Sequence, residues 1–193
     1  NAALRLAQNG AHVTVLEAET IGWGASGRSG GFCCLGGSIL SNRQMDRKFG
    51  EPARRDWHQA EIAAIDHVET LLNTHNIDAD RHSRGETLLA HSAKHWPDLQ
   101  PQAEEAANDY ATDPQLIPAT ELANHGLAGP FHGALTLPIG FALNPLKYTL
   151  GIAQAALDSG AQIYQSSPVH RIEKGTGFTL HTDHGRLTAK QLI

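Results

Sequence analysis

The first 17 residues carry the apolar pattern of a helix followed by a strand. The opening segment, NAALRLAQN, is built from strong helix formers, with Leu4 and Ala7 on one face and Gly10 where the helix would end. Residues 12–17, HVTVLE, form a mostly apolar, β-branched run that closes on a single acid, as in a buried parallel strand. Helix, glycine turn and strand together predict the second half of a βαβ unit.

The middle of the chain alternates helical and strand-like patterns. Apolar residues recur at spacings of three and four from Glu51 to Asn76, which predicts a long amphipathic helix. Further along, the pattern predicts strands over 85–91 and 133–137, separated by a polar helix over 98–110 and a short one over 119–124. This arrangement is typical of an α+β insertion.

The last third begins with a helix and ends in strands. Asn144 followed by Pro145 predicts a helix start, with Asn as the N-cap and proline at the first helical position, and Gly160 marks the end of that helix. The segments AQIYQ, PVHRIEK, GFTLHTD and GRLTAKQLI then predict strands joined by tight turns, the last strand running to Ile193. The whole pattern predicts an α/β fold that contains an α+β insertion.

Charge and hydropathy exclude some classes of partner. The chain has 15 Lys and Arg against 20 Asp and Glu, a formal net charge of −5, so no broad positive field is expected for nucleic acid or anionic lipid. No apolar stretch approaches the roughly 20 residues that a membrane-spanning helix requires. We therefore expect neither nucleic-acid binding nor a transmembrane segment.

The two cysteines, Cys33 and Cys34, are adjacent, a spacing too strained for an ordinary structural disulfide. This favours a reducing compartment, and hence a cytoplasmic location. A redox pair or a covalent attachment point is the functional alternative to two small packed side chains.

Histidine is common, with 12 residues, but its spacing does not predict a metal site. The pairs His91 with His95 and His181 with His184 lack cysteine or carboxylate partners at the spacing of zinc ligands. We predict no metal site and assign no histidine as a catalytic base.

Glu17 ends the first predicted strand, where dinucleotide folds place an acid that accepts hydrogen bonds from a ribose. The matching Gly-x-Gly-x-x-Gly turn would lie before Asn1. The alternative is an ordinary helix and strand pair in which Glu17 only terminates the strand.

The following segment, residues 18–38, is too rich in glycine for a regular element and predicts a long functional loop, which includes GWGASGRSGG at 22–31. Its glycines allow backbone N–H groups to approach a phosphate or a flat ring closely. Ser26 offers a hydroxyl, and Arg28 offers a cationic fork for a pyrophosphate. A flexible surface loop is the alternative.

The run ALRLAQNGAHVTVLEAETIGWGASGRSGGF resembles the FAD-dependent oxidoreductases of the D-amino-acid oxidase family, and within it the gamma-glutamylputrescine oxidase-like members. The similarity resumes over Phe141–Glu173, which includes SPVHRIE. It implies an incomplete Rossmann-like FAD-binding domain formed by 1–45 and 141–193, with a substrate domain inserted at 46–140. The cofactor-binding residues that it implies are Glu17, Ala18, Gly24, Ala25, Ser26, Gly27, Arg28, Gly30, Gly31 and Val169.

The resemblance also implies an activity. A family member oxidises the C–N bond of a small amine or amino acid by hydride transfer to FAD, and a gamma-glutamylputrescine-like substrate is favoured here. The alternatives are a glycine or D-amino-acid oxidase or dehydrogenase, and a non-catalytic nucleotide-binding fragment. The chain is expected to be a fragment that lacks the N-terminal strand and glycine turn and the C-terminal part, and no catalytic residue is assigned.

Overall fold

The computed structural model describes residues 1–193, which divide into two compact units. Unit 1 comprises residues 1–30, 71–80 and 144–193, and unit 2 comprises residues 31–70 and 81–143. The chain therefore leaves unit 1 after residue 30 and again after residue 80, and it returns each time.

Unit 1 is built on the predicted helix and strand pairs. Its β1 strand pairs in parallel with β7, and Val15 lies opposite Ile163 in the register. These elements are α1 (Ala2–Gln8), β1 (Thr14–Leu16), α6 (Pro145–Asp158) and β7 (Gln162–Tyr164). The predicted parallel strand is confirmed, but it is shorter than the apolar run 12–17.

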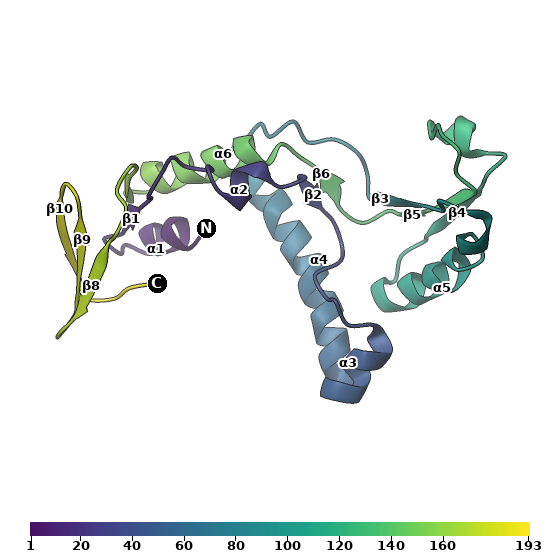
Figure 1. Cartoon of the computed structure of the whole chain (residues 1–193), viewed down its shortest axis with the longest axis horizontal. Helices are drawn as coiled ribbons and strands as arrows, with labels where there is room; N and C mark the ends of the chain where they lie inside the picture. The colour runs from purple at the N-terminus through teal and green to yellow at the C-terminus, as the bar shows by residue number, and fades with distance from the viewer. The chain divides into compact units, whose positions relative to one another are not determined.

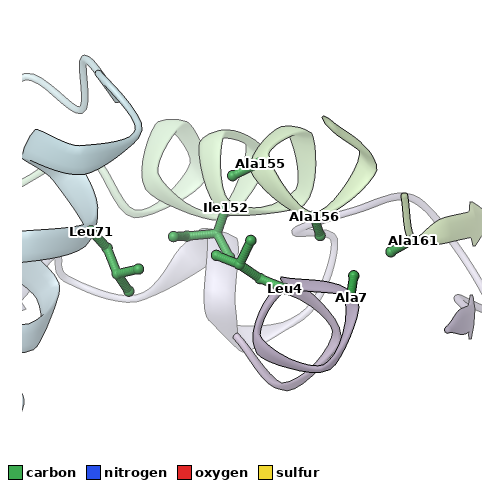
Figure 2. Packing of buried hydrophobic residues seen from close by; sticks show 7 residues of the cluster. All are labelled: Leu4, Ala7, Leu71, Ile152, Ala155, Ala156 and Ala161. Carbon is green, nitrogen blue, oxygen red and sulfur yellow. The ribbon is translucent and has the colours of Figure 1, made fainter. Parts of the chain in front are cut away.

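The core of unit 1 lies between α1 and α6, which run side by side (Figure 1). Figure 2 shows Leu4 and Ala7 of α1 facing Ile152 and Ala156 of α6. Leu71, Ala155 and Ala161 complete this buried cluster. Alanines make up much of this contact. α6 also contacts residues 25–28, in the segment that follows β1.

The helix α6 begins as the sequence predicts. The Asn144 side chain accepts a hydrogen bond from the Lys147 N–H at 3.1 Å, and Pro145 occupies the first helical position. Asn144 also donates to Asp80 at 3.2 Å. This end of α6 is thereby tied to residues 78–80.

The C-terminal strands of unit 1 form an antiparallel meander in the order β10-β9-β8. They are β8 (Arg171–Lys174), β9 (Phe178–Thr182) and β10 (Gly185–Ala189). The prediction that the last strand reaches Ile193 is wrong. Ala189 pairs with Phe178, the first residue of β9, so no partner remains for residues beyond it.

Unit 2 contains a three-stranded antiparallel sheet in the order β3-β5-β4, with α5 packed against it. Leu135, at the centre of the sheet, is fully buried among side chains of α5. The elements are β3 (Glu86–Leu89), α5 (Leu99–Tyr110), β4 (Gln115–Pro118) and β5 (Gly133–Leu137). Two short 3₁₀ helices, Ala93–His95 and Leu122–His125, lie in its connections.

Two further helices are α3 (Asn42–Phe49), in unit 2, and α4 (Glu51–Thr74), of which residues 51–70 belong to unit 2 and 71–74 to unit 1. The amphipathic pattern predicts α4 well but does not reveal α3, whose only buried residue is Met45. A capping box starts α3: the Ser41 side chain accepts from the Gln44 N–H, and the Gln44 side chain accepts from the Ser41 N–H.

The glycine-rich segment holds more regular structure than predicted. A single helical turn, α2 (Ala25–Arg28), and a short strand, β2 (Phe32–Cys33), occur where the sequence predicts only a loop. β2 pairs with β6 (Phe141–Ala142) inside unit 2. Backbone pairing compensates there for the low strand propensity of a glycine-rich segment. None of the helices has both the length and the apolar character that crossing a membrane requires.

Candidate functional site

Glu17 directly follows β1 and lies where two loops of unit 1 meet. Its N–H donates to the Tyr164 carbonyl at 2.8 Å, which extends the β1 and β7 pairing by one bond, and its own carbonyl accepts from the Ser167 N–H at 2.8 Å. The carboxylate oxygen Oε1 accepts from the Glu19 N–H at 3.0 Å. The other oxygen, Oε2, has no hydrogen-bond partner, so Glu17 offers an acceptor at the carboxyl end of a parallel strand.

The loop after Glu17 is also fastened to the segment after β7. Ser166 donates its N–H to the Glu19 carbonyl at 2.8 Å, and the Ile21 N–H donates to Gln165 Oε1 at 2.7 Å. Val169 lies two residues after Ser167, which contacts Glu17. The structure therefore brings the predicted ribose acceptor, Glu17, and another predicted cofactor residue, Val169, into neighbouring segments of unit 1.

The glycine-rich loop of unit 1 closes on itself between Gly22 and Gly27. A methyl group on Gly27 would come within 2.1 Å of the Gly22 carbonyl oxygen, and Gly22 has a φ of +78°, a conformation that L side chains rarely adopt. Thr149 of α6 donates its hydroxyl to the Ser26 carbonyl at 3.2 Å. The loop is thus compact, and Thr149 of α6 holds it from one side.

Two exposed side chains project from this closed loop. Arg28 places its guanidinium carbon 4.8 Å from the centre of the Trp23 ring. Arg28 forms neither an ion pair nor a side-chain hydrogen bond, so its donors are available to an anion. Gly24, between Trp23 and α2, faces open space, since nothing lies within 4 Å of the position of a Cβ there.

The predicted cofactor residues do not all fall in one unit. Glu17, Ala18, Gly24, Ala25, Ser26, Gly27, Arg28, Gly30 and Val169 belong to unit 1, and Gly31 is a buried residue of unit 2. Within unit 2 the Gly31 carbonyl accepts from the Leu143 N–H at 2.9 Å. The backbone carbonyl of Gly31, the last of the predicted glycines, is therefore already hydrogen-bonded within unit 2.

The sequence profile of the family described as FAD dependent oxidoreductase matches residues 1–193. The chain belongs to this family. FAD is therefore its cofactor, as the resemblance implies.

Curated relatives match the chain from end to end. A probable oxidoreductase OrdL of Haemophilus influenzae is 32% identical over 195 residues, and the gamma-glutamylputrescine oxidoreductase of Escherichia coli is 29% identical over 198 residues. In both cases all of this chain is covered, but only 45% of the relative. The chain spans less than half the length of these relatives.

Solved structures of low sequence identity confirm the fold. Glycine oxidase from Geobacillus kaustophilus matches with a TM-score of 0.73 and 22% identity, over 97% of this chain and 49% of that one. L-proline dehydrogenase from P. horikoshii matches with a TM-score of 0.64 and 19% identity, over 96% and 46%. The predicted α/β fold is thus correct.

The residues of unit 1 fit part of an FAD molecule. Glu17 offers a carboxylate oxygen without a partner for ribose hydroxyls, and Arg28 offers an unpaired cation for a pyrophosphate. Gly24 leaves its surroundings open to a ligand. Together they supply an acceptor for the ribose, a cation for the pyrophosphate and accessible backbone beside it.

Unit 2 contains a polar cluster that the sequence does not predict. The Asn42 amide donates to Asp109 and to Glu105, and Arg54 donates to Asp109 and to Asp46 at 2.8 Å. These contacts connect α3, α4 and α5 around an open cavity of about 380 Å³. Its lining residues are Asn42, Arg43, Asp46, Arg54, Glu105, Asn108 and Asp109.

A buried histidine and a tyrosine complete this cluster. His58 is only 4% exposed, and its Nε2 lies 3.1 Å from the Asn42 side-chain oxygen. Tyr110 packs at 4.8 Å from the His58 ring and donates its hydroxyl to Glu61 at 2.7 Å. Burial, and then the hydrogen bond to Glu61, raise the pKa of Tyr110 above its usual range. Since most of these groups satisfy one another, we interpret the cluster as a structural connection between helices.

The cysteines are both free and half-buried. Burial is the largest cause that raises the pKa of each thiol, and the neighbouring Cys34 adds to the effect on Cys33, as Glu86 does on Cys34. The Cys34 thiol donates to the Phe141 carbonyl at 3.8 Å. These surroundings are those of packed thiols and not of an activated nucleophile.

The predicted pairs of histidines lie apart from any ligand set. No group of three or more His, Cys, Asp or Glu side chains converges in a way that could hold a metal ion. On the meander of unit 1, His181 Nε2 lies 3.2 Å from Glu173 Oε2, and His170 Nε2 lies 2.8 Å from Asp183 Oδ1. The first pair connects β8 with β9, and the second connects the residues that flank these strands.

Proposed function

We propose that the intact protein carrying this chain is an FAD-dependent oxidoreductase that oxidises the C–N bond of a small amine or amino acid, with a gamma-glutamylputrescine-like substrate favoured. The observation that carries the proposal is the match of the whole chain, at 29% identity, to a relative named gamma-glutamylputrescine oxidoreductase. The chemistry that bound FAD supplies is the two-electron oxidation of the carbon next to the amine, which leaves an imine that water hydrolyses.

The contribution of this chain's own residues is to bind one part of the cofactor. We assign Glu17 to the ribose of the adenosine, because it ends a parallel strand with one carboxylate oxygen available. Arg28 and Ser26 are assigned to the pyrophosphate, together with the backbone of Gly24, Ala25 and Gly27. Ala18, Gly30 and Val169 are assigned to the walls of the same site, and Gly31, which belongs to unit 2, stays a prediction from the resemblance.

This assignment gives the segments of the chain different roles. We propose that 1–45 and 141–193 form the cofactor part and that 46–140 forms the substrate part. The proposed cofactor residues lie mainly in unit 1, and the α+β insertion supplies most of unit 2. The cytoplasmic location expected from the two reduced cysteines is part of the same proposal.

The experiment is an anaerobic absorption titration of the intact protein. The protein is expected to purify with a flavin spectrum, and gamma-glutamylputrescine is expected to bleach the flavin absorption band in a single turnover. Glycine and D-alanine, added in parallel, test the second substrate class, and putrescine without the glutamyl group tests the need for that group. Bleaching by glycine or D-alanine alone would replace the proposed substrate. A protein that cannot be loaded with FAD would contradict the proposed function.

A further inference from the structure

An aromatic side chain and a cation form an isolated pair at the tip of the glycine-rich loop. The Trp23 indole is 51% exposed, and the Arg28 guanidinium carbon lies 4.8 Å from its centre. This distance is within the range of an attractive cation and ring contact. Trp23 is therefore less buried than tryptophan usually is, and the Arg28 guanidinium lies over its ring.

Arg28 has no anionic partner, in contrast to the arginines of the chain that form ion pairs. Arg54 is held by Asp46 and Asp109, and Arg81 is held by Glu69. Arg171 pairs with Glu173 at 2.9 Å. Arg28 has only the face of the ring, which orients a guanidinium but leaves its N–H donors unused.

The backbone places the two side chains together. Gly22 and Gly27 are in close contact, and Trp23 and Arg28 are the residues that directly follow them. The Trp23 N–H donates to the Thr20 carbonyl at 2.9 Å, which fixes the start of the turn. The pairing of residues 23 and 28 is thus a consequence of the closed loop.

We propose that Trp23 is a positioning residue, which holds the Arg28 guanidinium over the loop so that its free donors meet the pyrophosphate of FAD. The inference rests on the proposed function, since it takes the Arg28 role from there. An unrestrained arginine loses much rotamer freedom when it binds a phosphate, and a ring that orients it beforehand reduces that loss. The contact itself is worth a factor of about two to five in affinity at such an exposed position.

The test is a double-mutant cycle on the FAD dissociation constant of the intact apo-protein, measured by quenching of flavin fluorescence. We expect Trp23→Leu to weaken FAD binding about two- to fivefold, Trp23→Phe to retain most of the affinity, and Arg28→Gln to weaken it about tenfold or more. In the Arg28→Gln background, Trp23→Leu should change the affinity by less than about 1.5-fold. Trp57→Leu, at a tryptophan of unit 2 that is 40% exposed, is the matched control and should leave the affinity unchanged.

Ionic strength gives a second readout that a purely structural tryptophan would not affect. The loss caused by Trp23→Leu should shrink as salt is raised, because salt screens the contact that Arg28 makes with the pyrophosphate. An equal effect of Trp23→Leu with and without Arg28 would overturn this inference while leaving the Arg28 assignment intact. An unchanged affinity in Arg28→Gln would overturn both.

Discussion

Replacing Gly27 with alanine tests whether the closed form of the glycine-rich loop is the one that binds FAD. The new methyl group would lie 2.1 Å from the Gly22 carbonyl oxygen, whereas real Cβ contacts essentially never fall below 3.0 Å. The backbone must therefore open by at least the difference, 3.0 − 2.1 = 0.9 Å. The obstacle is a backbone atom and not the end of a flexible side chain, so the loop itself has to move.

The expected cost follows from this displacement. Overpacking of this kind costs roughly 1 to 3 kcal/mol, and if the closed loop is required for binding, the FAD dissociation constant should rise by about 5- to 150-fold. The opening would also separate Trp23 from Arg28, so Gly27→Ala should lower the ionic-strength dependence of binding.

The assay is FAD binding by the intact apo-protein, with thermal unfolding measured on the same samples. Gly175→Ala is the matched control, because nothing lies within 4 Å of a Cβ at Gly175, and it belongs to the turn between β8 and β9. The control should bind FAD as the unmodified protein does. If Gly27→Ala also bound FAD with unchanged affinity, the closed loop would not be the binding conformation.

Three other substitutions or treatments have defined outcomes. Arg54→Met leaves Asp109 without its cation in a site where the two side chains are only 13% and 14% exposed, so the free energy of unfolding in urea should fall by about 2 to 4 kcal/mol. Arg55 is exposed, so the control Arg55→Met should lower it by less than about 0.5 kcal/mol. Equal costs for the two variants would contradict the argument from burial. Burial raises the pKa of the Glu86 carboxyl, so folding favours its protonated form. The protonated carboxyl contributes this stability fully below the usual glutamate pKa, and the contribution is lost as pH rises through the folded-state pKa. Glu86→Gln should therefore be more stable than the unmodified protein at about pH 7 but not at about pH 3.5, two values on either side of the usual glutamate pKa. Urea titrations at the two pH values measure this. If the difference in unfolding free energy between the two proteins were the same at both, burial of the Glu86 charge would not be its cause. Because burial raises the pKa of both cysteine thiols, iodoacetamide at about pH 8 should label Cys33 and Cys34 more slowly than free cysteine, as followed by mass spectrometry, and labelling at the rate of free cysteine would contradict it.

The sequence predicts best those elements whose signals are local. The α6 start is specified by Asn144 and Pro145 alone, and α4 by the spacing of its apolar residues, so both appear where expected. The apolar run of β1 predicts a parallel pairing, but the choice of β7 depends on contacts between residues far apart in the chain, such as Val15 and Ile163. Local patterns do not carry that information.

The candidate site divides in the same way. Glu17 and the glycine-rich loop are visible in the sequence, because an acid at a strand end and closely repeated glycines are signals carried by neighbouring residues. The stack of Arg28 on Trp23 requires the close contact of Gly22 with Gly27, which only the folded backbone reveals. The same holds for the structural cluster of unit 2, where His58 and Asp109 come from different helices and no sequence spacing predicts that they meet at 3.7 Å.

The most direct test of the proposed FAD site is the affinity of the intact apo-protein for two flavins, measured with Glu17→Gln. FAD carries the adenosine ribose that Glu17 is proposed to bind, whereas FMN lacks it. Loss of a hydrogen bond to a carboxylate should weaken FAD binding roughly 10- to 150-fold and leave FMN binding unchanged. Glu19→Gln removes the same charge two residues away and should affect neither flavin. Unchanged FAD affinity in Glu17→Gln, or an equal loss for both flavins, would contradict the claim that this strand end holds the ribose.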